Sequence, residues 1–195
     1  MLQTNRPSYL LAQPSVIIFY RMNVSPTLYV MVGYPGSGKT TVSNIIQKLT
    51  GAEHLWADHE RRQMFTRPTY KHEENLKLYA MLNQKAKQLL HQGRSVIFDT
   101  NFNFYKDREK MRRIAAGEGA KTVLIWITTK KDIARERATV HPLEGEHHRV
   151  LGNMPIKEFN RIARNLQPPR PEEHAIQLEG VDLNEQVIAA ALGLL

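Results

Sequence analysis

The chain has 195 residues, of which 42% are hydrophobic, so it can bury one α/β core but hardly a second. It contains no cysteine, which excludes disulfides, thiolate metal sites and a cysteine nucleophile. No apolar stretch approaches the roughly 20 residues of a membrane-spanning helix, so we expect a cytoplasmic protein without membrane contact, as a monomer or homodimer. The formal charge of +8 favours anionic partners such as nucleotides or nucleic acid, although a solvated basic surface would give the same balance.

The first 21 residues differ in composition from the rest of the chain. They contain no acidic residue, and their apolar run Val16–Tyr20 is shorter than the roughly 7–15 residues of an export-signal core. We therefore expect a disordered extension at 1–21, with Met22 as a candidate start, and a single domain over 22–195.

The first predicted strand and helix enclose a glycine-rich segment. Thr27–Val32 is a short apolar run typical of a buried parallel strand, and helical spacing of apolar residues runs from Thr41 until Gly51 stops it. Between them, Gly33–Thr40 matches the pattern G-x-x-x-x-G-K-[ST] at every specified position. Such a loop wraps backbone N–H groups around a phosphate at the positive end of a helix dipole. A glycine-rich turn that only reverses the chain is the alternative.

The motif assigns chemistry to individual residues. Lys39 is expected to reach the β- and γ-phosphates of ATP, and the Thr40 hydroxyl to hold Mg²⁺. The predicted nucleotide-binding residues are Gly33, Gly36, Ser37, Gly38, Lys39, Thr40 and Thr41.

Strands and helices alternate along the rest of the chain. Further strands are expected at 55–57, 95–98, 122–127 and 175–178, and helices at 59–65, 73–92, 106–116, 131–139, 155–165 and 184–192. This alternation predicts a three-layer P-loop NTPase domain, in which helices cover both faces of a mostly parallel five-stranded sheet.

Two aspartates follow predicted strands: Asp58 comes after the second and Asp99 after the third. Ligands of such sheets bind beyond the carboxyl ends of the strands. A kinase needs a group there that organises magnesium and a carboxylate that orients or deprotonates an acceptor hydroxyl. Asp99 is placed like a Walker B acid, so Thr40 and Asp99 are the predicted magnesium ligands. Capping of the helix that starts at His59 is the alternative for Asp58.

Three segments together resemble a known family. They are GYPGSGKTT at 33–41, the D-x-x-R segment Asp58–Arg61, and Val96–Asn103, which contains D-T-N. The combination is similar to the kinase domain of phage-type polynucleotide 5′-hydroxyl kinases and to the wider group of AAA-like P-loop kinase domains, over residues 27–184.

The resemblance implies roles for the acceptor side. Asp58 would be the general base that activates the acceptor hydroxyl, and Arg61 would contact a substrate phosphate. Asp99, Thr100 and Asn101 would lie along the acceptor site and organise the magnesium shell.

Kinases of this group also carry a short mobile lid whose arginines close over the transferring phosphate. Residues 131–154 have the position for such a lid, with Arg135 and Arg137 as its predicted cations. The polynucleotide kinase pattern has two lid arginines four residues apart, which neither arginine satisfies here, so Arg149 is a further candidate. The alternative is an exposed helix face where these arginines pair with acidic neighbours.

Two other site types fit the sequence poorly. His141, His147 and His148 lie close together, but their spacing matches no zinc pattern. Thr129–Asp132 mimics the guanine-reading T-K-x-D motif of GTPases, yet Asp99–Phe102 lacks the glycine of D-x-x-G. We therefore expect adenine as the base.

Three functions remain open. The first is an ATP-dependent kinase whose acceptor is a hydroxyl of a nucleic acid 5′ end, a nucleoside or another small molecule. The second is a small-molecule phosphotransferase of the antibiotic- or amino-sugar-type. The third is an ATP-hydrolysing regulatory protein, against which Asp58 and Arg61 argue because hydrolysis alone needs neither. No motif identifies the acceptor.

Overall fold

The computed structural model describes residues 25–140 and 154–195. The predicted extension at 1–21, Met22, the histidines at 141, 147 and 148, and Arg149 lie outside these ranges. In the part of the chain that is described, no helix is long and apolar enough to cross a membrane.

Five strands form one sheet in the order β2-β3-β1-β4-β5. They are β1 (Thr27–Val32), β2 (Glu53–Trp56), β3 (Val96–Asp99), β4 (Lys121–Ile127) and β5 (Ile176–Leu178). Every neighbouring pair is parallel, so the predicted, mostly parallel sheet is confirmed. Because β1 is central, the loop that follows it opens at the middle of the carboxyl edge of the sheet, where ligands bind in this class of fold.

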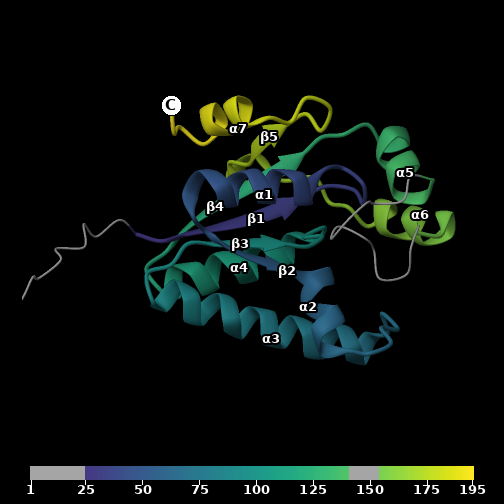
Figure 1. The fold of residues 1–195 in the computed structure, drawn as a ribbon, viewed down its shortest axis with the longest axis horizontal. Helices are drawn as coiled ribbons and strands as arrows, with labels where there is room; N and C mark the ends of the chain where they lie inside the picture. The colour runs from purple at the N-terminus through teal and green to yellow at the C-terminus, as the bar shows by residue number, and fades with distance from the viewer. Residues whose placement is uncertain (1–24, 141–153) are drawn as a thin grey trace, which may run out of the picture.

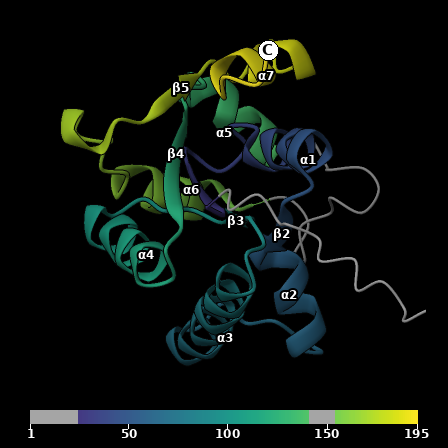
Figure 2. The same ribbon diagram turned by 90° about the vertical axis from the view of Figure 1, so that its left-hand side faces the viewer.

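Helices cover both faces of the sheet, as Figures 1 and 2 show. They are α1 (Lys39–Thr50), α2 (Ala57–Met64), α3 (His72–His91), α4 (Tyr105–Gly117), α5 (Lys131–Thr139), α6 (Ile156–Arg164) and α7 (Glu185–Ala191), with a 3₁₀ turn at Pro171–Glu173. One face carries α1 and α7, and the other carries α3 and α4. The predicted three-layer arrangement is therefore confirmed.

The alternation of side chains along β1 divides the core in two. Leu28, Val30 and Val32 belong to the cluster that contains residues of α3 and α4, whereas Tyr29 and Met31 belong to the cluster with α1 and α7. Because this strand is apolar on both faces, it reads as a continuous hydrophobic run rather than an alternating one.

Helix α1 ends where the sequence predicts. Gly51 caps it in the left-handed conformation, with φ of 69°, and its N–H donates to the carbonyl of Gln47. Glycine adopts this conformation without a Cβ penalty, which is why it terminates helices so often.

The predicted bounds of the second strand were wrong. The strand runs over Glu53–Trp56, and α2 begins at Ala57, so Asp58 lies in the first turn of the helix rather than at the end of a strand. The polar residues Glu53 and His54 take part in the pairing with β3, and a search for apolar runs misses them. The capping alternative for Asp58 was also wrong, because the N-cap of α2 is Trp56.

Helices α5 and α6 stand beyond the carboxyl ends of the strands (Figure 1). They pack on each other through a small apolar seam made of Ala134, Ala138, Phe159 and Ala163. Tyr34, from the glycine-rich loop after β1, packs against this seam, with its ring 6.3 Å from that of Phe159. The helix pair is thus docked on the loop itself.

Candidate active site

The loop between β1 and α1 has positive φ at three glycines, Gly33, Gly36 and Gly38. Gly33 and Gly36 have φ of 150° and 78°, in the region that side chains rarely adopt. A Cβ at Gly33 would lie 2.6 Å from Oγ of Ser37, and one at Gly36 would collide with the carbonyl oxygen of Ala134 on α5. The backbone of the loop is therefore tightly wrapped, as the pattern G-x-x-x-x-G-K-[ST] predicts. In addition, α5 packs closely against it at Gly36.

Lys39 lies inside this loop. Its side chain is buried, and Nζ donates to the carbonyl oxygens of Gly33 at 3.1 Å and Tyr34 at 2.8 Å. Ser37 is fully buried, and among the described residues its hydroxyl has no hydrogen-bond partner. A buried ammonium group and an unpaired hydroxyl near a helix N-terminus fit a phosphate ligand, because an anion would give the Ser37 hydroxyl a partner and could replace the carbonyl oxygens that accept from Lys39.

Asp99 ends β3 and is 3% exposed. It shares the sheet face of Ile97, and Ile97 belongs to the α1 cluster, so the carboxylate lies on the face covered by the helix that begins at Lys39. Nε2 of His54 donates to Oδ2 of Asp99 at 3.1 Å. His54 could not be found from the sequence, because its partner lies in another strand, 45 residues away.

Tyr79 on α3 joins the acceptor side of the predicted site. Its hydroxyl is hydrogen-bonded to that of Thr100 at 2.8 Å. Burial raises the pKa of Tyr79, and the charge of Asp58 raises it further, although the Thr100 bond and the charge of Arg61 act in the opposite direction. The Tyr79 phenol is thus hydrogen-bonded to Thr100 and lies within the electrostatic influence of both Asp58 and Arg61. No motif marks Tyr79, so sequence reasoning missed it.

Arg61 is only 3% exposed and has partners within the protein. It forms an ion pair with Glu74, Nη2 donates to Oδ1 of Asn75 at 2.7 Å, and the guanidinium lies 4.3 Å from the centre of the Tyr70 ring. Among the described residues, its Nε–H has no hydrogen-bond partner. The arginine therefore joins α2 to α3, and its contact with a substrate phosphate stays a prediction.

Glu74 is the acidic partner that holds Arg61 in place. Burial alone would raise its pKa, but hydrogen bonds from the Thr69 backbone, Arg61, the Thr69 hydroxyl and the Tyr70 backbone outweigh burial and lower the pKa to about 2. The segment before α3 is thereby tied to α2, next to Asp58.

The two predicted lid cations differ in their surroundings. Arg135 pairs with Asp132 at 3.0 Å on the same exposed helix face. Arg137 donates from Nη1 to the carbonyl of Gly180 at 2.8 Å. Gly180 lies against the loop, since a Cβ there would collide with Ser37. Arg137 is thus held beside the glycine-rich loop. Arg135 instead lies on an exposed helix face and pairs with an acidic neighbour, which is the alternative that the sequence left open for these arginines.

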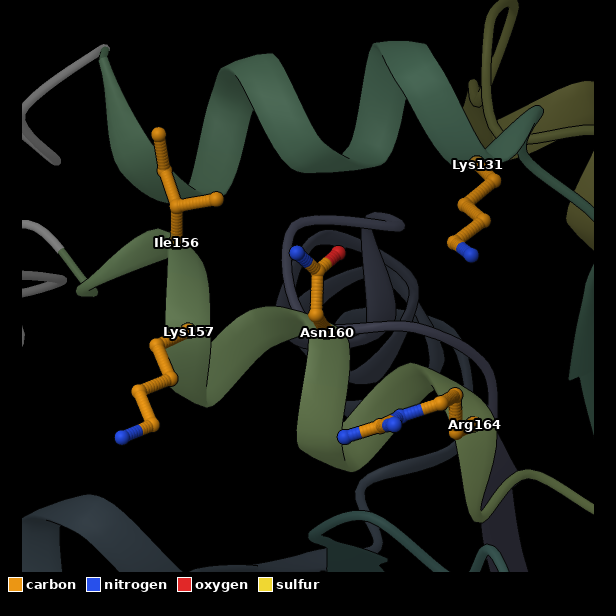
Figure 3. A pocket seen from close by; sticks show the side chains of 5 residues that line it. All are labelled: Lys131, Ile156, Lys157, Asn160 and Arg164. Carbon is orange, nitrogen blue, oxygen red and sulfur yellow. The ribbon is translucent and has the colours of Figure 1, made fainter.

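An open groove of about 540 Å³ lies between α5 and α6 (Figure 3). It is lined by Lys131, Ile156, Lys157, Asn160 and Arg164. Asn160 points from α6 toward α5, and the ammonium of Lys131 reaches toward it from the other side. Of the five described residues that line it, three are cationic and none is acidic, so the groove attracts anions.

A family model described as an AAA domain matches residues 28–169, which is most of the chain. The chain belongs to the AAA domain family. The predicted relationship to AAA-like P-loop domains is therefore confirmed. No curated protein matches this AAA domain chain.

Solved structures show the same fold. A gluconokinase from Sinorhizobium meliloti 1021 is 20% identical, with a TM-score of 0.60, and the match covers 87% of this chain and 91% of that one. The APS kinase CysC of Mycobacterium tuberculosis, solved with AMPPNP and APS, is 17% identical with a TM-score of 0.60, covering 87% and 97%. A chain of the Pnkp1/Rnl/Hen1 RNA repair complex is 18% identical with a TM-score of 0.60, covering 76% of this chain and 46% of that one. This AAA domain protein thus has a P-loop kinase-like fold.

Proposed function

We propose that this protein is an ATP-dependent kinase that transfers the γ-phosphoryl group to a hydroxyl of a nucleic acid 5′ end or a nucleoside. The observation that carries the proposal is the placement of two carboxylates at the carboxyl edge of the sheet, the edge from which the phosphate loop also emerges. Asp99 lies on the α1 face of the sheet, and Asp58 lies in the first turn of α2, beyond the neighbouring strand. A protein that only hydrolyses ATP needs no carboxylate for an acceptor alcohol.

The loop provides the features that a nucleoside triphosphate requires. Backbone N–H groups at the start of α1 and the ammonium of Lys39 would bind the phosphates, and the Thr40 and Asp99 oxygens would hold Mg²⁺. Mg²⁺ held by these oxygens would supply positive charge that offsets the charge of the phosphates. Lys39 would have to exchange its two carbonyl partners for phosphate oxygens on binding.

Asp58 would remove the proton of the acceptor hydroxyl as that oxygen bonds to the γ-phosphorus. The bond from this phosphorus to the bridging oxygen breaks in the same step, ADP leaves, and Asp58 keeps the proton until it passes to solvent. Arg137, held by Gly180 beside the loop, would offset charge on the transferring group. The neutral Tyr79 would support the acceptor side through Thr100.

Adenine is favoured over guanine. Thr129 would belong to a guanine-reading motif, but its hydroxyl donates to the carbonyl of Ser37 at 2.7 Å and so holds the phosphate loop. Asp132, which would bind the guanine, pairs with Arg135.

A second candidate is a phosphotransferase for small molecules. It is supported by the kind of protein that shares the fold, since the solved structures include a gluconokinase and an APS kinase. The basic groove between α5 and α6 instead favours an acceptor with several phosphates, as in the first candidate, because no acidic side chain among the described residues lines it.

The test is phosphate transfer from γ-labelled ATP to a panel of 5′-hydroxyl oligonucleotides, nucleosides, sugars and aminoglycosides. We expect Asp58→Asn to keep ATP binding and to lower transfer by about 10²- to 10⁴-fold, the usual effect of losing a general base. Lys39→Ala should abolish ATP use. Glu60→Gln is the matched control, because it removes the same charge from the same helix at a residue that pairs with Lys85.

Label that appears only as free phosphate, unchanged by Asp58→Asn, would contradict the kinase assignment and favour an ATP-hydrolysing protein. Label on a sugar or aminoglycoside alone would replace the nucleic acid acceptor with the second candidate.

A further inference from the structure

Three aromatic side chains stack in series at the carboxyl end of the edge strand β2. The rings of His54 and Trp56 are 6.3 Å apart and inclined by 17°, and those of Trp56 and His59 are 5.8 Å apart and inclined by 19°. The guanidinium of Arg62 lies 5.2 Å from the centre of the Trp56 ring. We call the three rings the aromatic ladder. These separations fall in the range of offset-stacked rings.

Core packing does not account for the ladder. Trp56 is half-buried but belongs to neither of the two hydrophobic clusters that fill the described sheet faces. The neighbours of its ring include two histidines and an arginine, which are polar and titratable. The ladder also ends in an exposed ring, because His59 lies on the surface. A large aromatic ring in such surroundings is typical of a stacking site for a ligand.

The ladder adjoins both predicted catalytic carboxylates. Trp56 and Asp99 are register partners on adjacent parallel strands, so their side chains emerge on the same face about 4.8 Å apart at the backbone. His54 donates a hydrogen bond to that same aspartate. Asp58 stands between Trp56 and His59 in the sequence, in the first turn of α2.

We infer that the aromatic ladder is a stacking platform for a nucleobase of the phosphate acceptor. This inference rests on the proposed kinase function and narrows its substrate class to compounds that carry a base. Two sources share that chemistry: a free nucleoside and the terminal nucleotide of a single strand. The base would stack on the outer ring, and the nearby guanidinium of Arg62 would attract a phosphate of the same strand.

Stacking distinguishes an acceptor that carries a nucleobase from a sugar or an amino sugar. Every nucleobase has a flat π-face, so an aromatic platform binds it without reading its sequence. A gluconate or an amino sugar has no such ring and would gain much less from three stacked aromatic rings. A sugar kinase would instead need several hydrogen-bonding side chains at this place.

The experiment uses Trp56 as its own probe. The chain contains two tryptophans, so Trp126→Phe leaves Trp56 as the single source of tryptophan fluorescence. The protein is titrated with a 5′-hydroxyl oligonucleotide, with an oligonucleotide of equal length whose first residues are abasic, with adenosine, and with gluconate. A base stacked on His59 would lie one ring away from Trp56 and should quench its fluorescence, whereas the abasic strand, which carries the same phosphates, should not.

Two ladder variants test the same contact through affinity. We expect Trp56→Leu and His59→Ala to weaken binding of the intact oligonucleotide by about 5- to 150-fold, the loss that corresponds to about 1–3 kcal/mol per stacked base. Binding of the abasic strand and of ATP should not change. His91→Ala is the matched control, since it removes an exposed histidine at the far end of α3, before β3.

Adenosine that quenches as well as the oligonucleotide identifies a nucleoside as the source of the base, and quenching by the oligonucleotide alone identifies a nucleic acid end. Equal quenching by intact and abasic strands, or no quenching by either base-bearing ligand, overturns the inference. The two proposals fail separately. Asp58-dependent transfer to a sugar without quenching would support the kinase activity and contradict base stacking on the aromatic ladder. Quenching without transfer to any acceptor would support base binding at the ladder and contradict the kinase activity.

Discussion

A buried ion pair holds the last part of the domain, and its removal should destabilise the protein strongly. Glu173 accepts hydrogen bonds from Nε and Nη2 of Arg108 at 2.8 and 2.7 Å, and from the backbone N–H of Arg170 at 2.9 Å. The two side chains of the Arg108–Glu173 pair are 1% and 0% exposed. Burial alone would raise the pKa of Glu173, but these hydrogen bonds, with the charges of Arg108 and Arg112, outweigh burial and lower the pKa to about 2. The carboxylate is therefore ionised throughout the physiological range.

Glu173→Gln removes the negative charge while keeping the shape of the side chain. The variant leaves the guanidinium of Arg108 buried without a counter-charge, and loss of one partner of such a pair usually costs about 3–5 kcal/mol. A typical domain has only about 5–15 kcal/mol of stability in total, so the change should be large. Replacing both residues, as in Arg108→Met with Glu173→Leu, should recover much of the loss because no unpaired charge stays buried.

Urea denaturation at neutral pH, followed by circular dichroism, measures the effect. The control is Glu158→Gln, which breaks the exposed pair with Arg161, where the arginine side chain is 60% exposed. Exposed pairs of this kind contribute about 0–1 kcal/mol. A Glu173→Gln variant whose unfolding free energy lies within about 1 kcal/mol of the wild type would show that the pair does not carry the stability assigned to it.

Two further predictions concern charge. Because the pKa of Glu74 falls from 4.5 to about 2 on folding, its contribution to stability is complete above pH 4.5 and is lost as the pH drops toward 2. Urea midpoints measured from pH 5 to pH 2.5 should decline more steeply in the wild type than in Glu74→Gln, and parallel curves would contradict the assignment. In the basic groove, combined replacement of Lys131, Lys157 and Arg164 by Ala should reduce the slope of log affinity against log salt for a single-stranded oligonucleotide by about 2, at roughly 0.7 per phosphate contact. Arg161→Ala, on the same helix but paired, should leave the slope unchanged, and an unchanged slope in the triple variant would remove the groove from the binding surface.

The phosphate loop could be predicted from sequence because everything that defines it is local. A strand, eight residues and a helix N-terminus are contiguous, so the motif and its context suffice to place Lys39. Asp99 was also predictable, because it ends an apolar run that forms a strand. The side-chain assignments of these residues to ATP and magnesium stay predictions.

The contacts that surround the loop could not be predicted in the same way. Arg61 and Glu74 are 13 residues apart, and Arg108 and Glu173 are 65 apart, so no periodicity links them. An arginine in a D-x-x-R segment looks like a ligand-binding residue, and only the fold shows that it also joins two helices. The polar residues at the start of β2 were missed for a related reason, since pairing with β3 rather than their own hydropathy places them in the strand.

The contact between Tyr34 and Phe159 gives a structural role to a position that the phosphate-loop pattern does not specify. Tyr34 occupies an unspecified position of the motif, yet it is the side chain through which the loop packs against the α5–α6 seam. A substitution at Phe159, more than a hundred residues away in the chain, would therefore be transmitted to the phosphate loop although every specified letter of the motif stayed the same. Two proteins that share every specified residue of this motif can thus position their loops differently, because residues at the unspecified positions make the packing contacts between the loop and the neighbouring helices.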